Sequence, residues 1–460
     1  MAEMRRFGPA DLLLLLVVVA VAAGARAGYL MTCADSGRNA GPIRVQEPAS
    51  RPGPVQGDAE LAALVASVKN GGFSAPTPFL PDGKTEEATA HVAPGYPFLL
   101  GQVAKLVAEE SFPAAIRWGQ CGLGALTAAF AYLFARRAFR SLAVGALAGL
   151  LVALNPFSIV ATATLDDGVL ASFALAGCLF LASQAGEKGG PFVSLLLGAA
   201  LAGTALVRAA FLPFSFAAMI WFLIRSRVLE RGWLCALVSF LGFVTALAPW
   251  TIRNVQAMGA PLPVVSSIYL HLWIGNNPAA DGGPATPGTW AKAPANELKA
   301  MPSQEARYAR LGRKVTEEAV AEPVKTMNRR LHAFLGFWVG DAWLKKGEVA
   351  QETGEGTEAP EWLAERADNA LMVALLAMLG LGLVGWRWSY GWRWESFPAA
   401  LAMFFVPLPY VLSHCEALSG PRLPLDTVLL CYAAFAVAAV LPGGGALLDA
   451  EKAGPPAEPA

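Results

Sequence analysis

The sequence predicts an all-α integral membrane protein with about ten transmembrane helices and two long segments outside the membrane. The chain of 460 residues is 55% hydrophobic and 15% charged, whereas roughly a quarter of the residues of a soluble protein are charged. Its apolar residues gather in stretches close to the about 20 residues that a helix needs to cross a bilayer. Each stretch is expected to be helical, because backbone groups in lipid have no water to bond.

Ten apolar stretches are candidates for these helices. The fifth and the sixth are short and meet at Arg208, so they could form one tight hairpin. The stretches cover approximately residues 11–32, 114–135, 139–155, 167–185, 191–207, 209–225, 233–250, 369–386, 397–413 and 423–441.

The distribution of Lys and Arg predicts the orientation, because short cytoplasmic loops are rich in these residues. With the N-terminus inside, the short outer loops carry almost none apart from Arg208 and Arg422. The cytoplasmic ends then carry Arg5, Arg6, Arg136, Arg137, Arg140, Lys188, Arg225, Arg227, Arg231, Arg387, Arg393 and Lys452. We therefore expect a multi-pass protein of the cytoplasmic (inner) membrane with both termini in the cytoplasm.

The N-terminal segment allows two interpretations. A basic start, an apolar run and Ala-Arg-Ala-Gly are typical of a cleavable signal peptide. The apolar stretch resumes through residues 28–31, however, and is long enough to span, which favours an uncleaved first helix. Either way, residues 33–113 lie outside the cytoplasm.

The chain is expected to divide into three regions. Residues 1–250 form a membrane core that includes the outer loop 33–113, residues 251–368 form a second non-cytoplasmic region, and residues 369–460 hold the last membrane helices and a short tail. Transporters that alternate between two faces often contain internal repeats, and none is evident in this sequence. The asymmetry favours a protein that works at one surface of the membrane.

Charge and cysteine content exclude some classes of function. The net charge is zero, which gives no support for a nucleic-acid partner. The six cysteines form no CxxC pair and no metal-binding spacing. Cys33 and Cys415 both fall near the outer face, so a disulfide between them could form if they lie close enough.

Four carboxylates stand where the chain enters a helix. Asp58 opens an apparent amphipathic helix and Glu60 lies in its first turn, where both could simply cap the helix. Asp166 and Asp167 precede the fourth span, and carboxylates that border a span often mark function. Whether these four are caps or reactive groups is open at this level.

Isolated cations and polar turns complete the candidate residues. Arg208 and Arg422 could snorkel to the interface, or hold a lipid phosphate with the planar guanidinium. Arg253 lies in a motif with Pro249, Trp250 and Asn254 after the seventh span. All four histidines, His91, His271, His332 and His414, map to the outer side, which loops would also produce by chance.

Seven short motifs, taken in order, resemble bacterial GT-C glycosyltransferases of the protein O-mannosyltransferase and lipid A aminoarabinose-transferase type. They extend from the first outer loop to the last span, so the resemblance covers nearly the whole chain. The motifs are Asp58 with the run to Gly71-Gly72-Phe73, Pro94-Gly95-Tyr96-Pro97, Leu165-Asp166-Asp167, Leu206-Val207-Arg208, Pro249-Trp250-Thr251-Ile252-Arg253-Asn254, Leu272-Trp273-Ile274-Gly275-Asn276-Asn277-Pro278 and Arg422-Leu423-Pro424-Leu425.

The resemblance implies an enzyme that moves a hexose or pentose from a polyprenyl-phosphate carrier to a lipid, glycan or protein acceptor at the outer face, with inversion. Asp58 would be the base, and Asp167 with Asp166 the second acidic element. The carrier phosphate would be held by Arg422, Arg208 and Arg253. Further substrate contacts would come from Glu60, His91, Tyr96 and Asn276.

The sequence departs from the family at two places. Relatives often have Tyr shortly after the first acidic residue, where this chain has Leu61, and Arg-Tyr-Arg before the last Leu-Pro, where it has Ser419-Gly420-Pro421-Arg422. The donor contacts and the acceptor therefore stay open. A divalent cation could bind among the aspartates and histidines, although nothing in the sequence requires a metal. A lipid or glycan transporter or flippase, and a catalytically silent GT-C protein, are the alternative interpretations.

The second outer segment is expected to cover the active site. Residues 284–290 are rich in Pro, Gly and Trp, residues 304–324 predict a charged and solvated helix, and residues 329–344 predict an amphipathic helix at the membrane interface.

Overall fold

The computed structural model describes residues 7–35, 57–80, 86–340, 361–390, 393–416 and 420–449. Within these ranges the regular secondary structure is helical, apart from one antiparallel pair of two-residue strands, β1 (Ser74–Ala75) and β2 (Glu87–Ala88). The all-α prediction is therefore confirmed.

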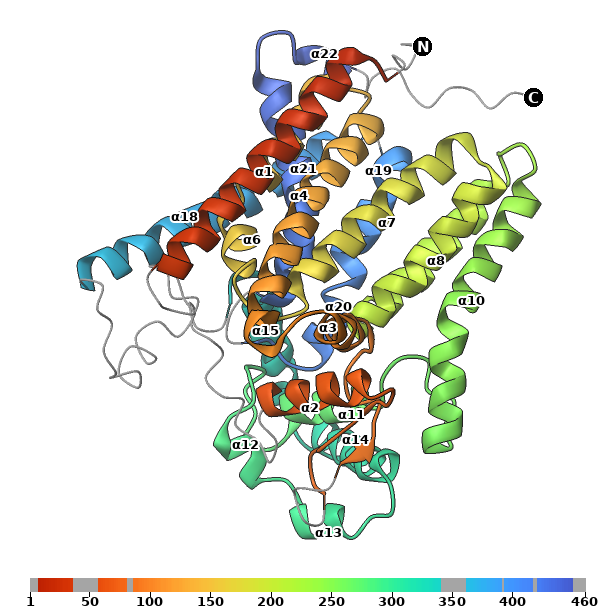
Figure 1. Ribbon diagram of the computed structural model, residues 1–460, viewed down its shortest axis with the longest axis vertical. Helices are drawn as coiled ribbons and strands as arrows, with labels where there is room; N and C mark the ends of the chain where they lie inside the picture. Colours follow the sequence, from red (N-terminus) through yellow and green to blue (C-terminus); the bar gives the residue numbers. More distant parts are fainter. Residues whose placement is uncertain are drawn as a thin grey trace.

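All ten predicted stretches fall on helices of one bundle (Figure 1). Neighbouring helices pack in pairs such as α8 with α10, α18 with α21 and α4 with α7. The bundle helices are α1 (Pro9–Asp35), α4 (Phe112–Ala138), α5 (Leu142–Ala153), α7 (Gly168–Lys188), α8 (Pro191–Val207), α9 (Leu212–Ser226), α10 (Gly232–Met258), α18 (Glu361–Trp388), α19 (Arg393–Phe405) and α21 (Leu423–Val440).

Six segments of the described chain are long and apolar enough to cross a membrane. They are Pro9–Thr32, Gly168–Glu187, Ala209–Ser226, Gly232–Met258, Asp368–Trp388 and Gly420–Val440. Three further apolar helices are shorter: Leu142–Ala153, Pro191–Val207 and Ser396–Leu412, the last including α20 (Leu408–Leu412). The predicted multi-spanning architecture is confirmed, with several spans shorter than expected.

The third predicted stretch is interrupted for a physical reason. Helix α5 has 12 residues and rises about 18 Å at 1.5 Å per residue. Asn155 then caps a second short helix, α6 (Pro156–Ala161), by accepting a bond from the backbone N–H of Phe157. The fully buried Arg26 of α1 donates to the carbonyl of Ala153 and to the hydroxyl of Ser158. A guanidinium from the first helix thus satisfies the end of α5.

The seventh span extends past its predicted end. The sequence suggested that the helix stops at Pro249-Trp250, but α10 continues through Pro249 to Met258 and ends at Gly259 with φ of 73°. The hydrogen bonds of Arg253 and Asn254, which lie on the added turns, explain the extension. Arg253 donates to the carbonyls of Thr89 and Phe73, and Asn254 donates to the carbonyl of Leu262. These contacts tie α10 to the outer segments.

The two predicted outer segments lie together at one end of the bundle, opposite the start of α1 and α22 (Gly445–Asp449) (Figure 1). Short 3-10 turns, η1 (Glu109–Ser111), η2 (Ala209–Phe211) and η4 (Gly420–Arg422), stand before helices of the bundle. The outer layer consists of α2 (Gly57–Lys69), the two strands, α3 (Gly95–Leu106), α11 (Ile268–Asn276), α12 (Pro287–Ala291), α13 (Ala295–Lys299), α14 (Gln304–Ala321) and α15 (Pro323–Val339).

The charged helix predicted for residues 304–324 is present as α14. Ser303 caps it by accepting a hydrogen bond from the backbone N–H of Ala306. One face, with Arg307, Tyr308 and Leu311, is buried against the outer layer. Helix α15 begins at Pro323, before its predicted start, and residues 341–344 of the prediction lie outside the described residues.

Candidate active site

Asp167 and Arg208 form an ion pair beside the outer layer, where α7 begins and α8 ends. Both Nε and Nη2 of Arg208 donate to the carboxylate of Asp167, and the Nε contact measures 2.9 Å. The side chain of Arg208 is 13% exposed and that of Asp167 is 30% exposed. The sequence suggested both residues as site residues, and the structure joins them as a bidentate pair that solvent can reach.

Arg208 has two further contacts. Its Nη1 lies 3.4 Å from the carbonyl oxygen of Pro421, and Tyr410 of α20 lies close enough to interact with it electrostatically. Burial disfavours the charged guanidinium, but the charge and hydrogen bonds of Asp167, together with Tyr410 and Asp166, raise the pKa of Arg208. The residue therefore stays cationic, as a phosphate ligand must.

Asp166 organises the turn before α7. Its carboxylate accepts from the hydroxyl of Thr164 and the backbone N–H of Gly168, both at 2.7 Å. Desolvation by the surrounding protein atoms raises the pKa of Asp166, and the negative charge of Asp167 raises it by a smaller amount. Asp166 thus makes the local turn, while Asp167 is directed to Arg208.

Tyr96 places the first outer segment against this pair. Its buried hydroxyl lies 3.4 Å from the side-chain oxygen of Gln120. Burial and the charges of Asp166 and Asp167 raise the pKa of Tyr96. A side chain at the preceding Gly95 would meet the carbonyl of Leu206 at 2.9 Å, so glycine lets α3 approach the end of α8.

Arg422, the other predicted phosphate ligand at a span end, is fully buried. Its Nε donates to Asp426 at 2.8 Å and its Nη1 donates to the carbonyl of Trp338 at 2.6 Å. The guanidinium also stacks 5.0 Å from the ring centre of Phe157, and Asn155 donates to the second oxygen of Asp426. In this conformation the guanidinium of Arg422 donates its hydrogen bonds to protein groups.

Arg253 also has protein partners. Besides the carbonyls of Thr89 and Phe73, it lies over the rings of Phe73 and Trp250 at 5.5 and 5.0 Å. These contacts join α10 to the strands of the first outer segment. Of the three arginines predicted to hold a phosphate, Arg208 is the one whose ion pair opens to solvent.

A second group of polar side chains gathers in the outer layer. His91 Nδ1 lies 2.6 Å from the hydroxyl of Tyr308, and His91 Nε2 lies 3.9 Å from the carboxylate of Glu60. The ring nitrogens of His271 and His414 are 3.2 Å apart, and the rings are stacked. The His91 and His271 ring centres are 6.4 Å apart. We call these five residues the outer cluster.

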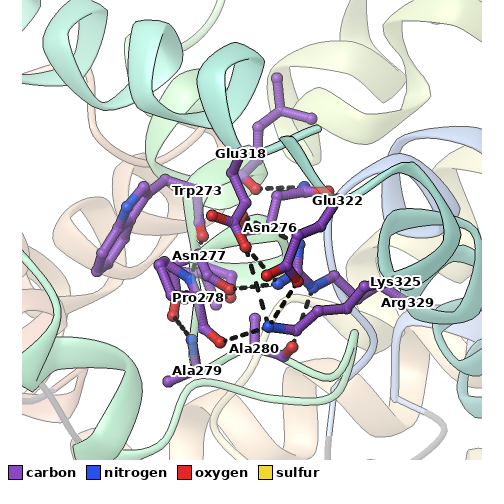
Figure 2. A network of polar contacts seen from close by, with 12 residues as sticks. Trp273, Asn276, Asn277, Pro278, Ala279, Ala280, Glu318, Glu322, Lys325 and Arg329 are labelled. Atoms are coloured by element: carbon purple, nitrogen blue, oxygen red, sulfur yellow. Dashed lines mark hydrogen bonds and ion pairs between the residues drawn. The ribbon is translucent and has the colours of Figure 1, made fainter. Parts of the chain in front are cut away.

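Asn276 lies in a network that fixes the end of α11 (Figure 2). Its side chain donates to the carbonyls of Leu272 and Leu412, and its own carbonyl accepts from Arg329. Arg329 is buried, bonds the carbonyls of Asn277 and Ala280, and pairs with Glu318. A cation at the C-terminal carbonyls of a helix is stabilising. The network positions α11 and, through it, His271.

Two predictions concern side chains outside the described residues. Asp58 lies in the first turn of α2, but its side chain is outside the described part, as is that of Cys33. The role of Asp58 and the Cys33–Cys415 disulfide stay predictions. In the part of the chain that the structure describes, no three His, Cys, Asp or Glu side chains form a group that could hold a metal ion.

Several contributors were missed in the sequence. Tyr410 was read as part of an apolar span, and Gln120 as part of another. Tyr308 could have been found from its spacing to Gln304 and Leu311, which lie four and three residues away and mark one buried helix face. Nothing in the local sequence indicates that Tyr308 meets His91, 217 residues away.

Comparison with known proteins supports the resemblance. Residues 91–252 match the family described as dolichyl-phosphate-mannose-protein mannosyltransferase. The match includes His91, Tyr96, Asp166, Asp167 and Arg208, and covers less than half of the chain. No curated protein sequence matches the chain.

Solved structures with a similar fold include the oligosaccharyltransferase of Archaeoglobus fulgidus tethered to an acceptor peptide, with 14% identity, a TM-score of 0.50, and coverage of 92% of this chain and 49% of that chain. The same enzyme with an inhibitory peptide and a dolichol-phosphate has 14% identity, a TM-score of 0.49 and coverage of 92% and 50%. This chain thus spans about half the length of these structures. The predicted GT-C membrane fold is confirmed.

Proposed function

We propose that this protein is a GT-C glycosyltransferase that moves a sugar from a polyprenyl-phosphate-linked donor to an acceptor at the outer face of the cytoplasmic membrane. The observation that carries the proposal is the Asp167–Arg208 pair, a cation at a span end with 13% exposure. It lies within the residues that match a family of dolichyl-phosphate-sugar enzymes. A lipid-linked phosphate would meet a cation at this depth.

In the proposed reaction an acceptor nucleophile attacks the anomeric carbon, and the bond from that carbon to the phosphate oxygen breaks. Arg208 stabilises the negative charge that grows on the phosphate, which is the type of interaction that strengthens in a transition state. The nucleophile's proton passes to Asp58 as the general base. One displacement inverts the anomeric configuration. The sugar is a hexose or a pentose, as the resemblance implies.

Replacing Arg208 tests the proposal most directly. The purified protein in lipid nanodiscs would receive polyprenyl-phosphate mannose labelled in the sugar, with membrane vesicles from a strain lacking this protein as the acceptor source. We expect Arg208→Ala to reduce transfer about 100- to 1,000-fold, the range for losing one charge-stabilising donor.

Arg313 of α14, an exposed arginine, supplies the matched control. Arg313→Ala removes the same charge away from the site and should transfer sugar at the wild-type rate. Wild-type-like transfer by Arg208→Ala would remove Arg208 from the phosphate site. A wild-type protein that consumes no donor would contradict the enzyme proposal and favour the silent GT-C alternative.

Asp58→Asn tests the base. General-base catalysis contributes roughly 10²- to 10⁴-fold, so we expect the rate of transfer to fall in that range. The donor KM should stay within a factor of about three of the wild-type value, because the phosphate contacts are intact. The pH–rate profile supplies a second measurement: the wild-type acidic limb should disappear in the variant. An unchanged rate would assign Asp58 a capping role only.

A further inference from the structure

The outer cluster lies close to the Asp167–Arg208 pair through two short tethers of chain. Residues 91–96 lead from His91 to Tyr96, and residues 410–414 lead from Tyr410, which lies near Arg208, to His414. Each tether spans at most about 14–18 Å when fully extended. The outer cluster therefore lies within that reach of residues that neighbour the pair.

Glu60 contains a buried oxygen that meets no partner among the described residues. The residue is 7% exposed and its side chain 9% exposed, and within the described part of the chain Oε1 makes no hydrogen bond. The distance of 3.9 Å from Oε2 to His91 Nε2 exceeds a hydrogen bond. A buried carboxylate without a donor is costly, so such groups in native proteins generally have a partner or a role.

His91 is held rigidly beside this carboxylate. Thr89 Oγ1 accepts from its backbone N–H, and Ser267 donates its hydroxyl hydrogen to its carbonyl. Burial first, and the charge of Glu60 second, raise the pKa of Tyr308, so its phenol keeps the proton it can donate to Nδ1. The remaining proton of neutral His91 is then on Nε2, which faces Glu60.

The paired histidines are held by each other and by the backbone. His414 Nδ1 lies 3.1 Å from the carbonyl oxygen of Cys415, so this nitrogen carries a proton. In a neutral ring its Nε2 accepts, and His271 Nδ1 donates to it. The acceptor that the outer cluster offers is thus Glu60 Oε1, and the cluster has a net negative charge when the histidines are neutral.

We propose that the outer cluster is the acceptor subsite and binds a hydroxyl or ammonium group of the acceptor, which donates a hydrogen bond to Glu60 Oε1. This rests on the proposed function, and it assigns the two polar groups of the site to different substrates. The donor phosphate belongs to Arg208, because a phosphate beside the buried Glu60 carboxylate would be repelled.

The test varies donor and acceptor separately. Labelled polyprenyl-phosphate mannose and acceptor vesicles from a strain lacking this protein would be titrated against wild type, Glu60→Ala, Glu60→Gln and the control Glu317→Gln, whose side chain lies exposed on α14. Removing a buried, unpaired carboxylate does not expose another charge, so both Glu60 variants should fold. Binding of polyprenyl phosphate alone, followed by fluorescence, checks folding and the donor site.

We expect Glu60→Ala to raise the KM for acceptor vesicles at least tenfold, with the donor KM and the Kd for polyprenyl phosphate within twofold. Glu60→Gln keeps a neutral acceptor oxygen: near-wild-type behaviour would identify a hydroxyl, and a loss equal to that of Glu60→Ala an ammonium. An acceptor KM equal to that of Glu317→Gln, or a rise in donor KM instead, would overturn the inference. A wild-type protein without transfer would instead contradict the proposed function.

Discussion

Two arginine–carboxylate pairs lie near the outer ends of the spans, and they differ in what surrounds them. Arg208 pairs with Asp167 from a different helix, and the two side chains are 13% and 30% exposed. Arg422 pairs with Asp426 one turn along its own helix, and the two are 0% and 1% exposed. Similar residues in the sequence thus supply one pair that can exchange partners and one that is enclosed.

The difference follows from the cost of opening each pair. A carboxylate and a guanidinium that water can reach separate for an incoming phosphate at a lower cost than an enclosed pair, because water solvates the two charges as they part. A buried pair must keep both charges compensated, since removing one partner costs about 3–5 kcal/mol. Arg422 is also bonded to Trp338 of α15, so it joins the last span to the outer layer.

The largest effect is expected from Arg422→Ala. The substitution leaves Asp426 charged and buried with Asn155 as its remaining donor, and should destabilise the fold by about 3–5 kcal/mol. The measurement is thermal unfolding of the detergent-solubilised protein, followed by size-exclusion chromatography of heated samples. Unchanged stability with a specific loss of donor binding would show that Arg422 binds the donor phosphate. The two arginine–carboxylate pairs would then not differ in function.

A smaller effect is expected from Asp167→Asn. Asp167 occupies Nε and Nη2 of Arg208, so a phosphate must displace it or share the guanidinium. Removing its negative charge should tighten binding of polyprenyl phosphate about tenfold, or about 1.4 kcal/mol, while transfer does not rise. Titration of the lipid against protein in nanodiscs gives the Kd. Weaker binding would mean that Asp167 positions Arg208 instead of competing with the phosphate.

The membrane helices were predictable from the sequence, because one rule governs them. Lipid-facing apolar stretches must be helical, and all ten fell on helices. The deviations have local causes that hydropathy does not measure. Arg26 satisfies the early end of α5, and Arg253 with Asn254 extends α10 beyond the apolar stretch.

The candidate site was predictable as a set of residue types, and its pairings were not. Asp167 and Arg208 are 41 residues apart, and nothing local shows that their helices end side by side. The burial of Arg422 did have a signal: Asp426 follows it by four residues, the spacing of facing side chains on a helix. The histidines carried little weight singly, and the structure groups three of them because α11 brings His271, and residues 410–414 bring His414, toward His91.

The smallest effect is expected from replacing the whole buried pair. Arg422→Met with Asp426→Leu removes both charges, and well-packed apolar residues often substitute for a buried ion pair at no cost or with a gain. Stability should therefore lie within about 1 kcal/mol of wild type, and sugar transfer should continue, although Arg422→Ala alone is expected to destabilise the protein by about 3–5 kcal/mol. Thermal unfolding and the labelled-donor assay measure the two quantities on one preparation. A stable double variant that no longer binds polyprenyl phosphate would instead assign the guanidinium of Arg422 to the phosphate site, and the enclosed pair would then have to open when the lipid binds.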